Sequence, residues 1–414
     1  MSDTGLPPHR PDPKTRVSTP IDAPAPRLYS PLNLGTYIVL NTTAHPRTGH
    51  DLLLEVLRTL FGKDERPPAC GEVAIPGERE IVDLLALSRR HEIAPLVARQ
   101  LSTTQGLPHA AGWAAREIYE RNLARNLFLR GETADWIARF RQAGIPCQAL
   151  KGAAWSQLLF RDLGARTSAD IDLLVRPHQR DEAIRLAARW GFEPFDPGRY
   201  FPDPEGKAVL LESRDEAACY TLDLHWYVEL PRLVPLDHTM FWSGQREEAD
   251  LPPDLVGLVL CLHLWRHAVT LKTLVDFAAY VNRFDGHVPE VRRRLAEARA
   301  VDGLDLALML AHRALGVRSR FTPERHPKAI FLPWLERCLR VPFSDRGRYF
   351  SWLVFPLQFD GLALPVRRCA AHVIRPAARD GRLHVGSRAR RVAGVVARVA
   401  FSRGRLAARR DDGR

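Results

Sequence analysis

The chain has 414 residues, enough for two or three domains, and 45% of them are hydrophobic while 26% are charged. These proportions are ordinary for a folded globular protein, so they exclude a fibrous or wholly disordered chain. The formal net charge is +12, but residues 366–414 contain 14 Arg, 3 Asp and no Lys or Glu, which excludes a uniformly basic protein because the rest of the chain is close to neutral.

The first 143 residues divide into two parts. Residues 1–48 are rich in Pro, with charged and small residues between the prolines, and we expect this extension to be disordered. In residues 49–143, apolar residues recur at helical spacing, and the stretch from Trp113 to Phe140 is long, charged and amphipathic. We therefore predict an N-terminal helical subdomain over residues 49–143 that packs against a central sheet.

A short apolar strand begins the central α/β core, which we place at residues 144–232. Ile145–Leu150 is the expected strand, Lys151 and Gly152 follow it, and the apolar run from Trp155 to Phe160 suits a helix. A strand, a tight glycine and a helix N-terminus form a corner at which backbone N–H groups and the helix dipole face an anion. Lys151 adds a positive charge there, and Gly152 lets a phosphate approach the backbone.

Two acidic residues, Asp170 and Asp172, alternate with apolar residues in the next predicted strand. On an extended strand, residues i and i+2 point to the same face, so the two carboxylates project together while Ile171 and Leu173 turn into a core. Neighbouring carboxylates repel each other, and a positive group normally offsets that cost. Mg²⁺ is the usual partner, because hard cations take oxygen ligands. Salt bridges to a nearby Arg at a solvent-facing strand end are the alternative.

A third acid lies on a later strand. The run from Tyr220 to Tyr227 alternates between apolar and polar residues, which indicates a strand with Asp223 and His225 on one face. Asp223 would complete a metal site with the first two acids. His225 could orient a carboxylate or take a proton, and a hydrogen-bonded structural histidine is the alternative.

Residues 250–345 return to a helical pattern and form a predicted C-terminal helical subdomain. Apolar helical segments are expected within Leu255–Phe284, at Leu304–Leu315 and at Leu332–Leu339. Asp276 lies in the first of these segments. It could contact substrate, or it could only pair with a neighbouring Arg or with Lys272.

His263 and His267 are four residues apart in the same apolar segment, as in a helical zinc pair. The glutamate of an HExxH motif is absent, because Leu264 follows His263, and no third ligand is apparent. We therefore favour histidines that are satisfied within a helix or that line a nucleotide cleft.

The remaining features concern compartment and surface. Six widely spaced Cys without CxxC or Cys/His spacing argue against a disulfide framework or a structural zinc site. No signal peptide is visible, and the longest apolar stretch, Leu255–Trp265, is too short to span a bilayer. We expect a cytoplasmic protein without a membrane span.

For the Arg-rich tail at residues 366–414, we favour a solvated end over a surface for RNA, anionic lipid or an acidic partner.

The chain resembles the nucleotidyltransferases of the DNA polymerase β superfamily, and within it the uncharacterised bacterial nucleotidyltransferase family proteins. The likeness covers roughly residues 80–285. The motifs that carry it are Leu150-Lys151-Gly152, Arg166, Asp170-Ile171-Asp172-Leu173-Leu174-Val175, Ala183-Ile184 with Gly191-Phe192, and Asp223-Leu224-His225-Trp226.

This resemblance implies an α+β fold, with a mixed nucleotidyltransferase-type sheet flanked by N- and C-terminal helical subdomains. It also implies a Mg²⁺-dependent reaction in which an NMP group passes from an NTP, such as ATP, to a hydroxyl or phosphate oxygen of an acceptor. A small molecule, a peptide or a polysaccharide precursor would serve as the acceptor. The resemblance implies that two Mg²⁺ ions are bound by three acids that also take part in catalysis, namely Asp170, Asp172 and Asp223. It further implies nucleotide binding by Lys151, Gly152 and Arg166, and accessory contacts by His225 and Asp276.

One position departs from the superfamily pattern. Most members carry a serine or a second glycine after the corner glycine, whereas Ala153 follows Gly152 here, so the phosphate-binding hydroxyl is missing. Two alternatives therefore stay open. One is an RNA-modifying nucleotidyltransferase that uses the basic tail, and the other is a binding protein that keeps the fold without catalysis.

Overall fold

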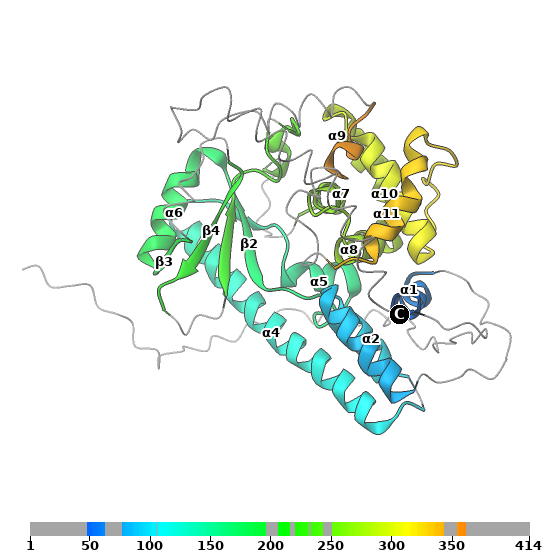
Figure 1. The fold of residues 1–414 in the computed structure, drawn as a ribbon. Helices are drawn as coiled ribbons and strands as arrows, with labels where there is room; N and C mark the ends of the chain where they lie inside the picture. Colours follow the sequence, from blue (N-terminus) through cyan, green and yellow to red (C-terminus); the bar gives the residue numbers. More distant parts are fainter. Residues whose placement is uncertain are drawn as a thin grey trace, which may run out of the picture. The chain divides into compact units, whose positions relative to one another are not determined.

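The computed structural model describes residues 48–62, 77–104, 106–195, 206–215, 220–231, 233–242, 251–342 and 354–361, all within one unit of the chain, Gly35–Arg414. The predicted Pro-rich extension, apart from Thr48, and the whole Arg-rich tail lie outside these residues. The strands are β1 (Cys147–Ala149), β2 (Asp170–Val175), β3 (Phe192–Pro194), β4 (Ala208–Ser213) and β5 (Thr221–His225). The α-helices, drawn in Figure 1, are α1 (Gly49–Phe61), α2 (Glu78–Arg90), α3 (Ala94–Ser102), α4 (His109–Gln142), α5 (Ala153–Phe160), α6 (Arg180–Arg189), α7 (Pro253–Arg266), α8 (Leu271–Phe284), α9 (Val288–Glu297), α10 (Val301–Leu315) and α11 (Leu332–Leu339).

The five strands form one mixed sheet in the order β1-β2-β5-β4-β3. Strands β2 and β5 run parallel, and the other neighbouring pairs are antiparallel. The expected α+β fold with a mixed sheet and flanking helices is therefore confirmed. Strand β3 is an addition that the sequence pattern did not indicate, because it has only three residues and ends at Pro194. Proline is tolerated there since β3 is an edge strand.

One face of the sheet packs against α4 and α6. Residues Ile171 and Leu173 of β2 and Leu222 and Leu224 of β5 are buried in this core. They meet a set of apolar helix side chains, namely Trp136, Ile137, Phe140, Ala183 and Ala187. The predicted alternation along both strands is confirmed, so the acidic residues of β2 and β5 must lie on the opposite face.

A second and larger core is built mainly by helices that precede and follow the strands in the sequence, together with α5. It includes apolar residues of α1, α2, α3, α5, α7, α8, α9, α10 and α11, together with Leu150 and Leu174. Leu174 lies two residues after Asp172 on β2, so it shares the acidic face. The acidic face of the sheet therefore borders this helical core, whereas the apolar face is covered by α4 and α6.

The predicted helical stretches are present, with one refinement. The apolar segment within Leu255–Phe284 consists of two helices, α7 and α8, separated by residues 267–270, of which Ala268 and Val269 have positive φ angles of 57° and 56°. The boundaries that we predicted for the helical subdomains stay predictions. Cys147, Cys261 and Cys338 are buried free thiols. Within the described part of the chain, no helix combines the length and apolar character needed to cross a bilayer.

Candidate functional site

A sharp corner between β1 and α5 places Lys151 beside the acidic face of the sheet. The N–H of Leu150 donates to the carbonyl oxygen of Asp172 at 3.0 Å, so the chain leaves β1 in register with β2. Gly152 then adopts φ 78° and ψ −152°, a conformation that is essentially restricted to glycine, and α5 begins at the next residue. Gly152 is the N-cap of α5 and has no side chain to cap the helix, so the first N–H groups of α5 suit an anion.

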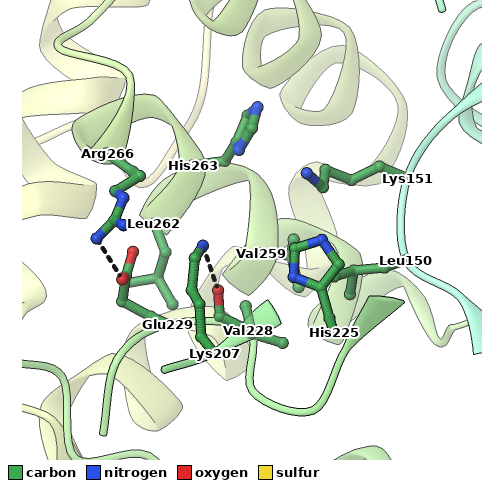
Figure 2. A pocket seen from close by; sticks show the side chains of 10 residues that line it. All are labelled: Leu150, Lys151, Lys207, His225, Val228, Glu229, Val259, Leu262, His263 and Arg266. Carbon is green, nitrogen blue, oxygen red and sulfur yellow. Dashed lines mark hydrogen bonds and ion pairs between the residues drawn. The ribbon is translucent and has the colours of Figure 1, made fainter. Parts of the chain in front are cut away.

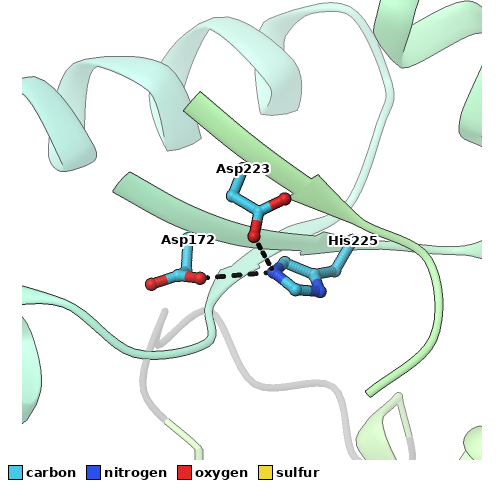
Figure 3. Close-up of side chains that lie close together, drawn as sticks. All are labelled: Asp172, Asp223 and His225. Carbon is cyan, nitrogen blue, oxygen red and sulfur yellow. Dashed lines mark hydrogen bonds and ion pairs between the residues drawn. The ribbon is translucent and has the colours of Figure 1, made fainter. Parts of the chain in front are cut away.

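The pairing of β2 with β5 brings two carboxylates together. In the parallel register, Asp172 lies directly opposite Asp223, and Asp170 lies opposite Thr221. His225 follows on the same face of β5, and its Nε2 is 3.2 Å from Oδ1 of Asp172 and 2.9 Å from Oδ2 of Asp223 (Figure 3). The atoms of Asp172, Asp223 and His225 that could bind a metal ion all lie within 4.8 Å of one another. We call these three residues the acid–histidine cluster.

Cationic side chains offset the repulsion within this cluster. Nζ of Lys151 is 2.8 Å from Oδ1 of Asp172, and the two side chains are 15% and 5% exposed. Burial alone would raise the pKa of Asp172, but Lys151 and His225 hold that pKa well below its usual range. Burial would likewise lower the pKa of His225, but the charges of Asp223 and Asp172 raise it above its ordinary value. Asp172 is therefore anionic at neutral pH, next to the ammonium of Lys151 and the imidazole of His225.

Asp170 lies at the outer end of the same strand face. Its carboxylate does not belong to the group of possible metal-binding atoms formed by the acid–histidine cluster. Burial raises the pKa of Asp170, and the negative charge of Asp172 raises it further. The reason is positional, because Asp170 begins β2 and faces Thr221 instead of a second acid. The structure thus brings Asp172, Asp223, His225 and Lys151 into contact and leaves Asp170 beside them.

Arg166 and Asp276 contact each other. Nε of Arg166 is 3.0 Å from Oδ2 of Asp276 in α8, and both side chains are buried. The guanidinium also donates to the carbonyl oxygen of Gly152 at 3.3 Å. Of the two roles considered for Asp276, the structure shows the pairing with an arginine, and Lys272 instead pairs with Glu92 at 2.9 Å. Arg166 therefore ties the corner glycine to α8.

Two asparagines on α4 hold the loop that leads into β2, and sequence reasoning missed them. Nδ2 of Asn122 donates to the carbonyl oxygens of Gly164 and Arg166 at 2.8 and 3.0 Å. Nδ2 of Asn126 donates to those of Leu163 and Arg166 at 2.6 and 2.8 Å. The available signal was a pair of polar residues with i,i+4 spacing in a long amphipathic helix, which indicates one shared helix face.

The histidines of α7 do not form a metal site with other described residues. The rings of His263 and His267 are 4.1 Å apart, yet no acidic or sulfur ligand joins them in a group of three donors within the described chain. His263 instead lines a pocket together with Lys151 and His225. His263 lies within α7, whereas His267 is the C-cap residue of that helix and is not among the residues that line the pocket. The two interpretations favoured from the sequence, histidines satisfied within a helix or lining a nucleotide cleft, stay predictions.

The donor set of the acid–histidine cluster fits a divalent cation. Carboxylate oxygens suit hard ions such as Mg²⁺ and Mn²⁺, and an imidazole nitrogen extends the range towards transition metals. The cluster can thus hold a metal through Asp172, Asp223 and His225, next to a corner suited to phosphate.

Comparisons with known proteins agree with this geometry. A family model described as "Uncharacterised nucleotidyltransferase" matches residues 77–316. This range contains the corner, both strands of the acid–histidine cluster and helices α7 and α8. Searches of curated proteins and of solved structures found no significant match. Because the match spans more than half of the chain, the protein belongs to this uncharacterised nucleotidyltransferase family.

Proposed function

We propose that the protein transfers an NMP group from an NTP to a hydroxyl or phosphate oxygen of an acceptor, with the help of a divalent cation. The acid–histidine cluster directly beside the Lys151–Gly152 corner is the observation that carries this proposal. Among the residues of the cluster, the facing pair Asp172 and Asp223 supplies two carboxylates at one point of the sheet. We propose Mg²⁺ as the physiological ion and ATP as the first nucleotide to test.

The corner is the proposed binding site of the nucleotide phosphates. Lys151 and the first N–H groups of α5 flank Gly152 in the chain, and Gly152 contributes no Cβ that would hinder a phosphate. Ala153 supplies no hydroxyl, so the contact that a serine would provide falls to the backbone and to Lys151. Arg166 acts indirectly in this proposal, because its guanidinium is committed to Asp276 and to the carbonyl oxygen of Gly152.

The two acids of the cluster differ in accessibility, which suggests different roles. The side chain of Asp172 is 5% exposed and is held by Lys151 and His225. The side chain of Asp223 is 26% exposed, so an acceptor hydroxyl can reach it. We therefore assign proton acceptance from the acceptor to Asp223 and cation binding to both acids. Asp170 is proposed as a third acid at the outer end of this face.

A bound divalent cation would neutralise phosphate charge and make the attacking oxygen easier to deprotonate. The residues proposed to hold it are Asp172, Asp223 and His225, whose donor atoms are already grouped. For His225 to serve as a ligand through Nε2, the ring proton has to lie on Nδ1.

The test is calorimetric binding of the four NTPs to the full chain, with Mg²⁺, with Mn²⁺ and with EDTA. We expect one NTP to bind only when a divalent ion is present. The double variant Asp172→Asn/Asp223→Asn should weaken this binding by more than roughly tenfold, since it removes both carboxylates of the cluster. Asp181→Asn is the matched control, because Asp181 is an exposed acid on α6 whose side chain is 62% accessible.

Two results would contradict the proposal. One is the absence of binding for every NTP by folded wild-type protein, which favours a binding protein that keeps the fold without catalysis. The other is NTP binding of equal strength in the wild type and the double variant. Product formation is then assayed with the bound NTP and a panel of hydroxyl and phosphate acceptors.

A further inference from the structure

A pocket adjoins the acid–histidine cluster on the side of α7. Its lining comes from the β1–α5 corner, from Lys207 just before β4, from the end of β5 with the loop that follows it, and from α7. Figure 2 shows the ammonium groups of Lys151 and Lys207 directed into this space from different sides, with the rings of His263 and His225 around it. The polar lining is thus rich in hydrogen-bond donors.

Lys207 brings an ammonium group to the pocket without a direct ion pair to a described residue. Its Nζ donates to the carbonyl oxygen of Val228 at 3.2 Å, and it forms no ion pair with any residue that the structure describes. An ammonium has three N–H donors, so two have no partner among the described residues. The backbone of Lys207 is fixed, because its carbonyl oxygen accepts from the N–H groups of Trp226 and Tyr227 at 2.9 and 3.1 Å. Lys207 is therefore a positioned cation rather than a mobile surface lysine.

The single carboxylate in the lining, Glu229, favours the charge of Lys207 from a distance but bonds to other groups. Oε1 of Glu229 accepts from Arg266 at 2.9 Å and from the N–H of Leu230 at 2.9 Å. The ammonium of Lys151 is likewise paired with Asp172. The ammonium of Lys207 thus has no direct carboxylate contact among the described residues, and the apolar part of the lining strengthens its attraction to an anion by excluding water.

The imidazole rings of His225 and His263 add further hydrogen-bond donors to the pocket. Nδ1 of His225 is buried and has no hydrogen-bond partner in the described residues, while Nε2 of the same ring contacts the two acids. Neither ring nitrogen of His263 hydrogen-bonds to a described residue, although the ring contacts that of His267. A buried polar atom without a partner is costly, so Nδ1 of His225 is a second and independent sign that this pocket accommodates a polar ligand.

We propose that this pocket binds a phosphate-class oxyanion, with Lys207 as the principal charge and His263 and His225 as hydrogen-bond donors. The anion is a phosphate group carried by one of the substrates, either the terminal part of the nucleotide or a phosphate on the acceptor. Only the choice between these two sources rests on the proposed function. The oxyanion site itself stands on the lining of the pocket.

The test is a calorimetric titration of the full chain with inorganic phosphate. Lys207→Met keeps the length of the side chain and removes its charge, so phosphate affinity should fall roughly tenfold or more. Lys272→Met is the control, because Lys272 pairs with Glu92 away from the pocket, and phosphate affinity should not change. No phosphate binding by folded wild type, or equal affinity in wild type and Lys207→Met, overturns the proposal.

A measurement on the wild type covers the case in which Lys207→Met does not fold. Acylation of lysines is followed by mass spectrometry with and without phosphate. We expect phosphate to slow the modification of Lys207 and to leave that of Lys272 unchanged. Equal modification rates of Lys207 with and without phosphate contradict the site.

A final titration with phosphate, in the presence of saturating Mg²⁺ and NTP, identifies the source of the anion. Displacement of phosphate by the NTP assigns the pocket to the nucleotide, and unchanged phosphate binding assigns it to the acceptor. Phosphate binding by a protein that binds no NTP upholds the oxyanion site while it contradicts the proposed nucleotidyl transfer, so the two failures can be told apart.

Discussion

Asp172 and Asp223 lie opposite each other in neighbouring strands, yet their surroundings differ. Asp172 is 5% exposed and contacts both Lys151 and His225, whereas the side chain of Asp223 is 26% exposed and, among the described residues, pairs with His225. A charge that is buried next to a counter-charge depends strongly on that partner, and an exposed charge does not. The two acids should therefore respond differently to the same substitution.

Asp172→Asn should destabilise the fold by roughly 3 kcal/mol, because it leaves the ammonium of Lys151 buried without its carboxylate. Asp223→Asn should change the free energy of unfolding by less than about 1 kcal/mol, since its carboxylate is more exposed. Urea unfolding at pH 7 measures both values. Equal destabilisation by the two variants would show that the Lys151 contact contributes little.

Acid should destabilise the protein through its buried histidines. Burial, together with the smaller effect of nearby cations such as Lys151, lowers the pKa of His267 to about 3. An unfolded histidine has a pKa of about 6.5, so below that pH the unfolded chain binds a proton that the native ring does not. Stability is therefore unaffected by this group above pH 6.5 and falls as the pH decreases towards 3.

His267→Gln removes this linkage and should reduce the stability lost between pH 7.5 and 5.0 by up to about 2 kcal/mol. Urea unfolding curves of wild type and variant at the two pH values give the difference. His178→Gln, at an exposed position next to β2, is the control and should leave the loss unchanged. The same loss in His267→Gln as in wild type would assign the acid sensitivity to other groups.

At the scale of single elements, the corner between β1 and α5 determines where Lys151 and the first N–H groups of the helix point. Gly152 permits this corner through its backbone conformation, with φ 78° and ψ −152°. A Cβ at Gly152 would meet only the carbonyl oxygen of Asp170, at an ordinary 3.7 Å. Within the described fold, glycine is thus required here for its backbone conformation, and the space that it leaves matters only for a bound phosphate.

Gly152→Ala should therefore cost roughly 1–3 kcal/mol of stability and shift Lys151 away from Asp172. Gly131→Ala is the matched control, because Gly131 lies inside α4 and a Cβ there meets nothing within 4 Å. That control should stabilise the protein by roughly 0.5–1 kcal/mol. Thermal unfolding of both variants checks the opposite signs, and a neutral Gly152→Ala would contradict the strained corner.

At the scale of the whole molecule, the sheet and the helical core are joined by buried polar contacts as well as by apolar packing. The pair Arg166–Asp276 links the loop before β2 to α8 across 110 residues of sequence. Both side chains are less than 10% exposed, at 7% and 2%. Removal of either partner leaves the other as an uncompensated buried charge.

A double-mutant cycle should reveal this link. Arg166→Met and Asp276→Asn should each cost roughly 3–5 kcal/mol, and the double variant should cost less than the sum, because no lone charge remains buried. Denaturant unfolding of the four proteins gives the coupling energy. Additive losses would mean that the two residues contribute independently.

The sequence by itself determined the local features of this protein. Alternation along β2 and β5 predicted which residues face the core and that Asp223 and His225 share a face, because a strand has a period of two. Glycine after a strand predicted the corner at Lys151 and Gly152, and helical spacing predicted most of the helices. The family likeness seen in these motifs agrees with the family match over residues 77–316.

Only the tertiary structure decided which of these residues meet. Strand register places Asp172 opposite Asp223 and leaves Asp170 opposite Thr221, and no period along one strand contains that information. The pairing of Arg166 with Asp276, and the convergence of Lys207 and His263 beside Lys151, join segments far apart in the chain. Such contacts depend on how the sheet and the helices pack, which is a property of the folded chain and not of any local stretch of sequence.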